Sequence, residues 1–182
     1  TIYHTNNYTF IDTPGFNDTD GKEKDAQTVQ DIKTLIDTTL DHIHGICFVV
    51  KNGDNRHSPP MMRVITTVLS LFAKDVLYNI YIIVTHVDDD DIETPVIIKE
   101  HLILSNIDGS HIFGVCNKPF MKPPKKAGKV GQGLHEYTEE QLHLLFEQIY
   151  QCQHVRTILT KKTILMKEAI KAHINDLNER IN

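Results

Sequence analysis

Residues 8–16 read YTFIDTPGF, an apolar segment that ends in a carboxylate, a proline and a glycine. The β-forming residues carry Asp12 to the end of a strand, and Pro14 and Gly15 then interrupt the ladder. The backbone N–H groups that follow are free to face a ligand. This pattern is typical of a phosphate site, although Asp-Thr-Pro-Gly is also an ordinary turn. The remainder of the chain decides between the two interpretations.

A hairpin and a helix are predicted around this turn. Ile2–His4 and Tyr8–Ile11 flank paired asparagines, which tolerate the positive φ of a tight hairpin. Apolar residues from Ala26 to Ile43 recur at three- and four-residue steps, which predicts an amphipathic helix that Gly45 ends.

Three continuous apolar runs then predict strands of a parallel sheet: Ile46–Val50, Ile80–Val84 and His111–Cys116. Helices are expected between them, after the caps Ser58-Pro59 and Thr94-Pro95. This alternation predicts a doubly wound α/β fold, with a mostly parallel sheet and helices on both faces.

The C-terminal third is expected to be a loop and two helices. Lys118–Tyr137 is rich in Lys, Pro and Gly and predicts a long loop. Thr138 opens a capping box that begins a helix continuing to Ile149. Residues 155–181 predict an amphipathic helix folded on the core, because their apolar spacing departs from a strict heptad. The expected domains are residues 1–150 and a helical extension at 151–182.

Composition narrows the class of protein. The chain has 182 residues, 40% of them hydrophobic and 24% charged, which is ordinary for one globular core. Its net charge of −5 argues against nucleic acid as a partner. No apolar run approaches bilayer length and no signal peptide is visible, so a cytoplasmic location is expected. The chain begins at Thr1 without methionine, so an excised or incomplete piece is expected.

Four lysines lie in or beside the loop after residue 118: Lys122, Lys125, Lys126 and Lys129. They favour a solvated loop over a contact with acidic lipid, and a peripheral membrane contact stays open. The cysteines Cys47, Cys116 and Cys152 have no metal-ligand spacing, and His42 and His44 lie on different sides of the expected helix end. No metal site other than one for Mg²⁺ is therefore predicted.

Polar residues follow three of the predicted strands, namely Asp12, Thr85–Asp88 and Asn117. In open α/β sheets, ligands bind at the carboxyl edge of the strands. The sequence therefore predicts one ligand site built from these residues.

The order and spacing of these segments resemble the septin-like (TRAFAC class) P-loop GTPases. Within that class the chain is most similar to the AIG-type, immunity-associated nucleotide-binding branch, over residues 8–149. Four segments carry the resemblance: Ile11–Phe16, His44–Val50, Asn79–Asp88 and Val115–Asn117. The sequence NRHS at residues 55–58 also resembles that branch.

The resemblance implies roles for individual residues. Asp12 would hold Mg²⁺ through water, and Gly15 would meet the γ-phosphate of GTP. Asp88 would accept hydrogen bonds from the guanine N1–H and the exocyclic amine. Asn117 would lie beside the base.

Thr85 and His86 are the other implied nucleotide contacts, and His86 stands where most GTPases carry a lysine. Phe16 occupies the position of the water-orienting glutamine, so hydrolysis should be slow or completed by a dimer partner. The motif Gly-x-x-x-x-Gly-Lys-[Ser/Thr] occurs nowhere in the chain. We therefore expect this chain alone to be poorly stable and to bind GTP weakly or not at all.

Three functions are consistent with these patterns. The leading one is a switch dependent on GTP or GDP and Mg²⁺ that self-associates through its G domain. The alternative is a nucleotide-free pseudo-GTPase that serves as a protein-interaction module. An ATP-specific P-loop enzyme is the third, and Asp88 argues against it.

Overall fold

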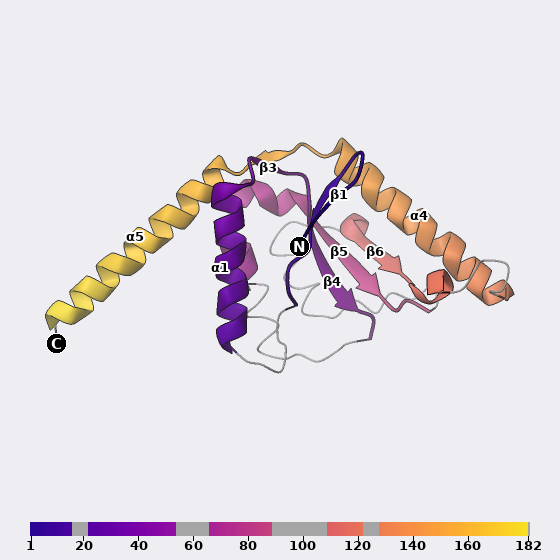
Figure 1. Ribbon diagram of the computed structural model, residues 1–182, viewed down its shortest axis with the longest axis horizontal. Coiled ribbons are helices and arrows are strands. Elements are labelled where there is room, and N and C mark those ends of the chain that lie inside the picture. Colours follow the sequence, from indigo (N-terminus) through magenta and orange to yellow (C-terminus); the bar gives the residue numbers. More distant parts are fainter. Residues whose placement is uncertain (16–21, 54–65, 89–108, 122–127, 182) are drawn as a thin grey trace. The chain divides into compact units, whose positions relative to one another are not determined.

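The computed structural model describes residues 1–15, 22–53, 66–88, 109–121 and 128–181 (Figure 1). The chain is an α/β protein that splits into two compact units. The first comprises Thr1–Asp41, Ser58–Ala73 and Arg156–Asn182, and the second comprises His42–His57 and Lys74–Val155.

The second unit contains a three-stranded parallel sheet in the order β4-β5-β6 (Figure 1). The strands are β4 (Ile46–Lys51), β5 (Ile80–Thr85) and β6 (Ile112–Val115), close to the predicted ranges. The central strand β5 is buried on both faces, with Ile80, Tyr81, Ile82 and Val84 at most 2% exposed. The prediction of a parallel sheet built from apolar runs is confirmed.

β4 differs from the expectation for a strand covered on both faces. Its side chains alternate in burial, and Val49 is 63% exposed. Cys47 and Val49 are register partners of Tyr81 and Ile83, so they lie on the sheet face that carries Tyr81. The described helix on that face packs against β6, at the opposite edge of the sheet, and this leaves β4 exposed there.

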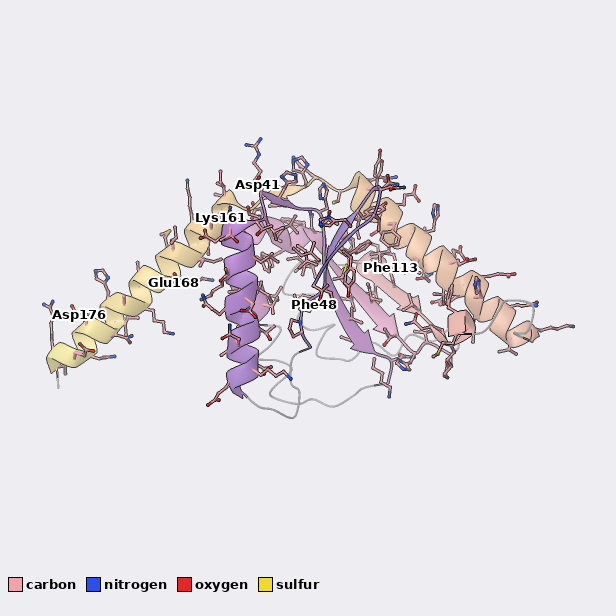
Figure 2. All side chains as sticks on the ribbon, in the orientation of Figure 1. Asp41, Phe48, Phe113, Lys161, Glu168 and Asp176 are labelled. Carbon is pink, nitrogen blue, oxygen red and sulfur yellow. The ribbon has the colours of Figure 1, made fainter. Side chains whose placement is uncertain are left out.

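That helix is α4 (Lys129–Gln151). Tyr81, Phe113 and Leu145 form the buried cluster between helix and sheet, and Figure 2 labels Phe113 on β6. Helix α4 begins at Lys129, so the prediction of a loop up to Tyr137 was wrong.

Two glycines near the start of α4 suggested a loop, since each costs about 1 kcal/mol in a helix. Tertiary contacts offset that cost. The His135 ring stacks on Phe120 with ring centroids 4.3 Å apart, and Thr138 is fully buried.

The first unit contains the predicted hairpin, β1 (Ile2–His4) paired antiparallel with β2 (Thr9–Ile11). The predicted role of the asparagines in its turn was wrong, because His86 is the one described non-glycine residue with positive φ. Instead, the Thr5 hydroxyl accepts the Tyr8 N–H at 2.9 Å. Past the strand, Asp12 exchanges two backbone hydrogen bonds with Thr1, of 2.7 and 2.8 Å.

Helix α1 (Lys22–Thr38) ends before the predicted Ile43. The carbonyl of Leu35 accepts the N–H groups of both Thr39 and Leu40, which closes the last turn. The next residues form β3 (His42–Ile43), which pairs with β7 (Val155–Arg156).

Helix α5 (Ile158–Ile181) confirms the predicted C-terminal helix. Thr160 and Ile164 are buried, and Glu168, labelled in Figure 2, pairs with Lys33 of α1 at 3.3 Å. The apolar side chains beyond them are more than half exposed, so the packing predicted for the whole helix is limited to its first turns. These side chains are Leu165, Met166, Ile170, Ile174, Leu177 and Ile181. No helix in the described part of the chain is both long and apolar enough to cross a membrane.

Several predictions fall outside the described residues: Phe16, the NRHS segment at 55–58, the helix starts at Ser58 and Thr94, and the lysines at 122, 125 and 126. Residues 66–71 are helical, as expected for the later part of the helix predicted after Ser58.

Replacing Gly45 should destabilise the second unit. A Cβ added there would lie 2.9 Å from the buried Tyr81 ring. We expect Gly45→Ala to lower the free energy of unfolding by about 1–3 kcal/mol, because this overpacks a rigid aromatic contact. Urea denaturation measures the change.

Gly133→Ala is the matched control, since no atom lies within 4 Å of its added Cβ. In the interior of α4 it should raise stability by about 0.5–1 kcal/mol. A Gly45→Ala protein as stable as the parent would contradict the packing described for Tyr81.

Candidate functional site

The three parallel strands end level with one another. Lys51 is the register partner of Thr85, and Thr85 is the register partner of Val115. The chain therefore leaves β4, β5 and β6 at a single carboxyl edge. This edge brings together four of the predicted site residues: Thr85, His86, Asp88 and Asn117.

Thr85 joins the ends of β4 and β5. Its hydroxyl donates to the Val50 carbonyl at 3.1 Å, and its own carbonyl accepts the Asn52 N–H at 2.8 Å. The Thr85 hydroxyl also contacts His86 Nδ1 at 3.1 Å. Thr85 therefore fixes the position from which the next loop begins.

The loop after β5 alternates exposed and buried side chains. His86 adopts φ 62°, a left-handed conformation that histidine tolerates better than most residues. Val87 is fully buried, and its N–H donates to the Val115 carbonyl at 3.3 Å. Because Val87 is anchored in this way, His86 and Asp88 on either side of it are exposed to solvent.

Asp88 forms an ion pair with Lys118. Lys118 Nζ donates to both carboxylate oxygens, at 2.7 and 3.0 Å, and the Cys116 thiol lies 3.6 Å from Oδ1. The hydrogen bond from Lys118 is the main cause that lowers the pKa of Asp88 below its ordinary value. The same contact raises the pKa of Lys118. The edge therefore presents an exposed, ionised carboxylate in a defined position.

Sequence reasoning treated Lys118 only as the start of a loop. A usable signal was present, because Asp88 is the third residue after β5 and Lys118 the third after β6. Parallel strands that end in register place such residues side by side.

The end of β6 is held by Thr138 of α4. Its hydroxyl accepts the Cys116 N–H at 3.0 Å and lies 3.4 Å from the Cys116 carbonyl oxygen. Thr138 was predicted to cap a helix N-terminus, and this was wrong, since it lies buried inside α4. The buried hydroxyl instead positions the chain that continues to Asn117, whose carbonyl accepts the Phe120 N–H at 3.1 Å.

Asp12 and Gly15 belong to the first unit. Both are exposed, and Asp12 directly follows β2 of the hairpin. Their implied roles toward Mg²⁺ and the γ-phosphate stay predictions.

No protein-family model matches this chain, and no curated protein matches it at a significant level. The chemistry of the edge therefore rests on its own geometry. An anchored carboxylate that accepts hydrogen bonds, beside an exposed imidazole and an amide, is suited to a ligand with adjacent N–H donors.

Removing the Thr138 hydroxyl should destabilise this edge. Thr138→Val keeps the volume of the side chain and leaves the Cys116 N–H buried without its acceptor. The free energy of unfolding should fall by about 1–3 kcal/mol, measured by urea denaturation. Thr163→Val on α5 is the control, because the Thr163 hydroxyl donates to the Leu159 carbonyl of its own helix at 2.8 Å, and it should change stability by less than about 0.5 kcal/mol. Equal effects of the two substitutions would refute the role given to Thr138.

Lys118→Met should raise the pKa of Asp88 toward its ordinary value, because the main cause of the lowered pKa is removed. A carboxyl pKa lowered by folding stabilises the protein above the unfolded pKa, and that contribution is lost as pH falls through the folded pKa. The variant should therefore lose less stability in acid than the parent.

NMR titration of the Asp88 carboxyl carbon measures this pKa directly. Lys171→Met on α5 serves as the control and should leave it unchanged. An Asp88 pKa that is the same in the parent and in Lys118→Met would contradict the ion pair.

Proposed function

We propose that this chain is part of the guanine-nucleotide-binding domain of a septin-like GTPase of the AIG-type branch, and that the carboxyl edge of β5 and β6 recognises the base. The observation that carries the proposal is the exposed, ionised carboxylate of Asp88, held at the strand ends by Lys118.

Guanine presents two neighbouring donors, N1–H and the exocyclic amine, whereas adenine presents no such pair. A carboxylate accepts both at once because its two oxygens provide about four acceptor positions. Lys118 takes two of these positions and the Cys116 thiol, at 3.6 Å from Oδ1, takes a third, so guanine would bind through both donors after the thiol leaves Oδ1.

The neighbouring side chains fit a flat aromatic ligand. His86 is exposed beside Asp88, and an imidazole can stack on a purine in place of the lysine that most GTPases carry. Asn117 is exposed at the end of β6, where the resemblance puts it beside the base.

The phosphate side of the proposed site is less complete. Asp12 would hold Mg²⁺ through water and Gly15 would meet the γ-phosphate, as the resemblance implies. A P-loop motif, which would bind the α- and β-phosphates, is absent from this sequence. The isolated chain should therefore bind guanine nucleotides weakly, through the base.

β4 is an edge strand of the described sheet, with Cys47 and Val49 exposed, which fits a doubly wound fold whose neighbouring first strand is not in this sequence.

Hydrolysis of GTP in the intact protein would be slow or assisted by a second copy bound through the G domain, because Phe16 replaces the usual glutamine.

A nucleotide-free interaction module is the second candidate. The exposed apolar side chains of α5 from Leu165 to Ile181 favour it, because such a stripe suits a protein partner.

Asp88→Asn tests the assignment of the base. The amide replaces one acceptor with a donor, so it should favour xanthine, which carries a carbonyl where guanine has the amine. We expect the ratio of the affinity for guanosine monophosphate to the affinity for xanthosine monophosphate to fall by at least about tenfold. The reason is that the free energy of one hydrogen bond to a charged group corresponds to about a tenfold or larger change in affinity. Ligand-observed NMR at millimolar nucleotide measures these weak affinities.

Asp176→Asn on α5 is the control and should leave the ratio unchanged. An unchanged ratio in Asp88→Asn would refute base recognition by Asp88. If the parent chain binds none of these nucleotides at millimolar concentration, the interaction module becomes the better account.

A further inference from the structure

Helix α5 carries a continuous row of exposed apolar side chains, which we call the α5 stripe. Each of them is between 52% and 81% exposed: Leu159, Met166, Ile170, Ile174, Leu177 and Ile181. At about 100° per residue they fall within an arc of about 80°, and the helix rises about 33 Å from the first to the last. Leu165 is 63% exposed but lies outside this arc. The stripe is therefore a narrow apolar surface along one side of the helix.

The contacts that hold α5 on the first unit leave the stripe exposed. Thr160 and Ile164 are the buried residues of the helix. Farther along, Glu168 pairs with Lys33 of α1 at 3.3 Å, and Lys167 Nζ donates to the carbonyl of Ser70. None of these contacts uses a side chain of the stripe, so its apolar side chains are available to a ligand.

Basic side chains border the α5 stripe on both sides. The helical repeat puts four exposed residues there: Lys162 and Arg180 along one border, and Lys167 and Lys171 along the other. An apolar strip between two basic borders is the pattern of helices that lie on anionic lipid surfaces.

The acidic side chains of α5 lie farther round the helix from the stripe. Glu168 and Asp176, both labelled in Figure 2, are in ion pairs, the second with Arg180 at 2.9 Å. Glu179 lies on the side opposite the stripe. The chain as a whole carries a net charge of −5, yet charges more than about 8 Å apart are largely screened at physiological ionic strength. The local positive charge beside the stripe therefore decides what it attracts.

A second copy of this helix is a poor match for the stripe. Two helices that pack through apolar stripes bring the residues on the borders of one stripe against those of the other. Both borders are basic here, so parallel and antiparallel pairing would each bring like charges together. An anionic surface instead offers the opposite charge to both borders at once.

We propose that α5 binds the surface of membranes that contain acidic phospholipids, with its axis parallel to the membrane. The α5 stripe then enters the boundary between headgroups and acyl chains, where its side chains leave water. The bordering lysines contact the anionic headgroups. Membrane binding by α5 is independent of nucleotide binding at the carboxyl edge of the sheet.

Co-sedimentation of the 182-residue chain with phospholipid vesicles tests the role of the stripe. The parent should bind vesicles of about two parts phosphatidylcholine to one part phosphatidylserine, and bind phosphatidylcholine alone at least about tenfold more weakly. Ile170→Glu should weaken binding to the mixed vesicles by at least about tenfold, because it places a charge in the stripe. Leu165→Glu is the matched control and should bind within about twofold of the parent.

Two adjacent lysines test the role of the basic borders. Lys162→Gln should weaken binding by about fivefold, which is the contribution of one basic residue near an anionic surface. Lys161 lies on the side opposite the stripe, so Lys161→Gln should change binding by less than about twofold. Equal effects of the two substitutions would contradict the assigned borders.

Far-UV circular dichroism of each variant should match that of the parent, and Ile170→Gln provides a second variant without an added charge. Absence of binding to the mixed vesicles by the parent would overturn the proposal. Binding that both Ile170 variants leave unchanged would also overturn it, because another part of the chain would then hold the lipid. Sedimentation equilibrium without vesicles gives a further test. Self-association that Ile170→Glu abolishes, with no vesicle binding by the parent, would assign the stripe to a second copy instead.

Discussion

The in-register parallel pairing of β5 with β4 and β6 is the constraint on which the candidate site depends. This pairing aligns Lys51, Thr85 and Val115, so that the chain leaves all three strands at the same edge of the sheet. The alternation of more buried and exposed side chains along β4 favours this register, because a slip by one residue would exchange the two faces of that strand. The site is therefore a consequence of how the apolar runs pack.

Two buried groups turn that edge into a defined surface. Val87 anchors the loop after β5, and the Thr138 hydroxyl anchors the chain after β6. The exposed residues between these anchors, Asp88 and Lys118, then meet as an ion pair. A surface ion pair contributes little to stability, so its main effect here is to hold an ionised carboxylate in one orientation.

The sequence predicted the strands well because continuous apolar runs are a direct signal of a buried parallel sheet. It also predicted that Asp12, Thr85–Asp88 and Asn117 would share one edge. Thr85, His86, Asp88 and Asn117 end or follow the strands of the parallel sheet as predicted, whereas Asp12 follows β2 of a separate two-stranded sheet. The ends of the helices were less predictable. The start of α4 depends on the contacts of Phe120 with His135 and of Thr138 with Cys116, which join residues distant along the chain. The glycines near this start favoured a loop in the sequence-based prediction. Lys118 was missed because its partner is thirty residues away in sequence.

We propose that the carboxyl edge of β5 and β6 recognises a guanine base. Amide chemical-shift mapping of the isotope-labelled chain with guanosine and adenosine monophosphates tests this recognition most directly. We expect the guanine nucleotide to shift the amides of residues 86–88 and 116–118, and the adenine nucleotide to shift them much less. Equal shifts with both nucleotides, or shifts concentrated elsewhere in the chain, would contradict it.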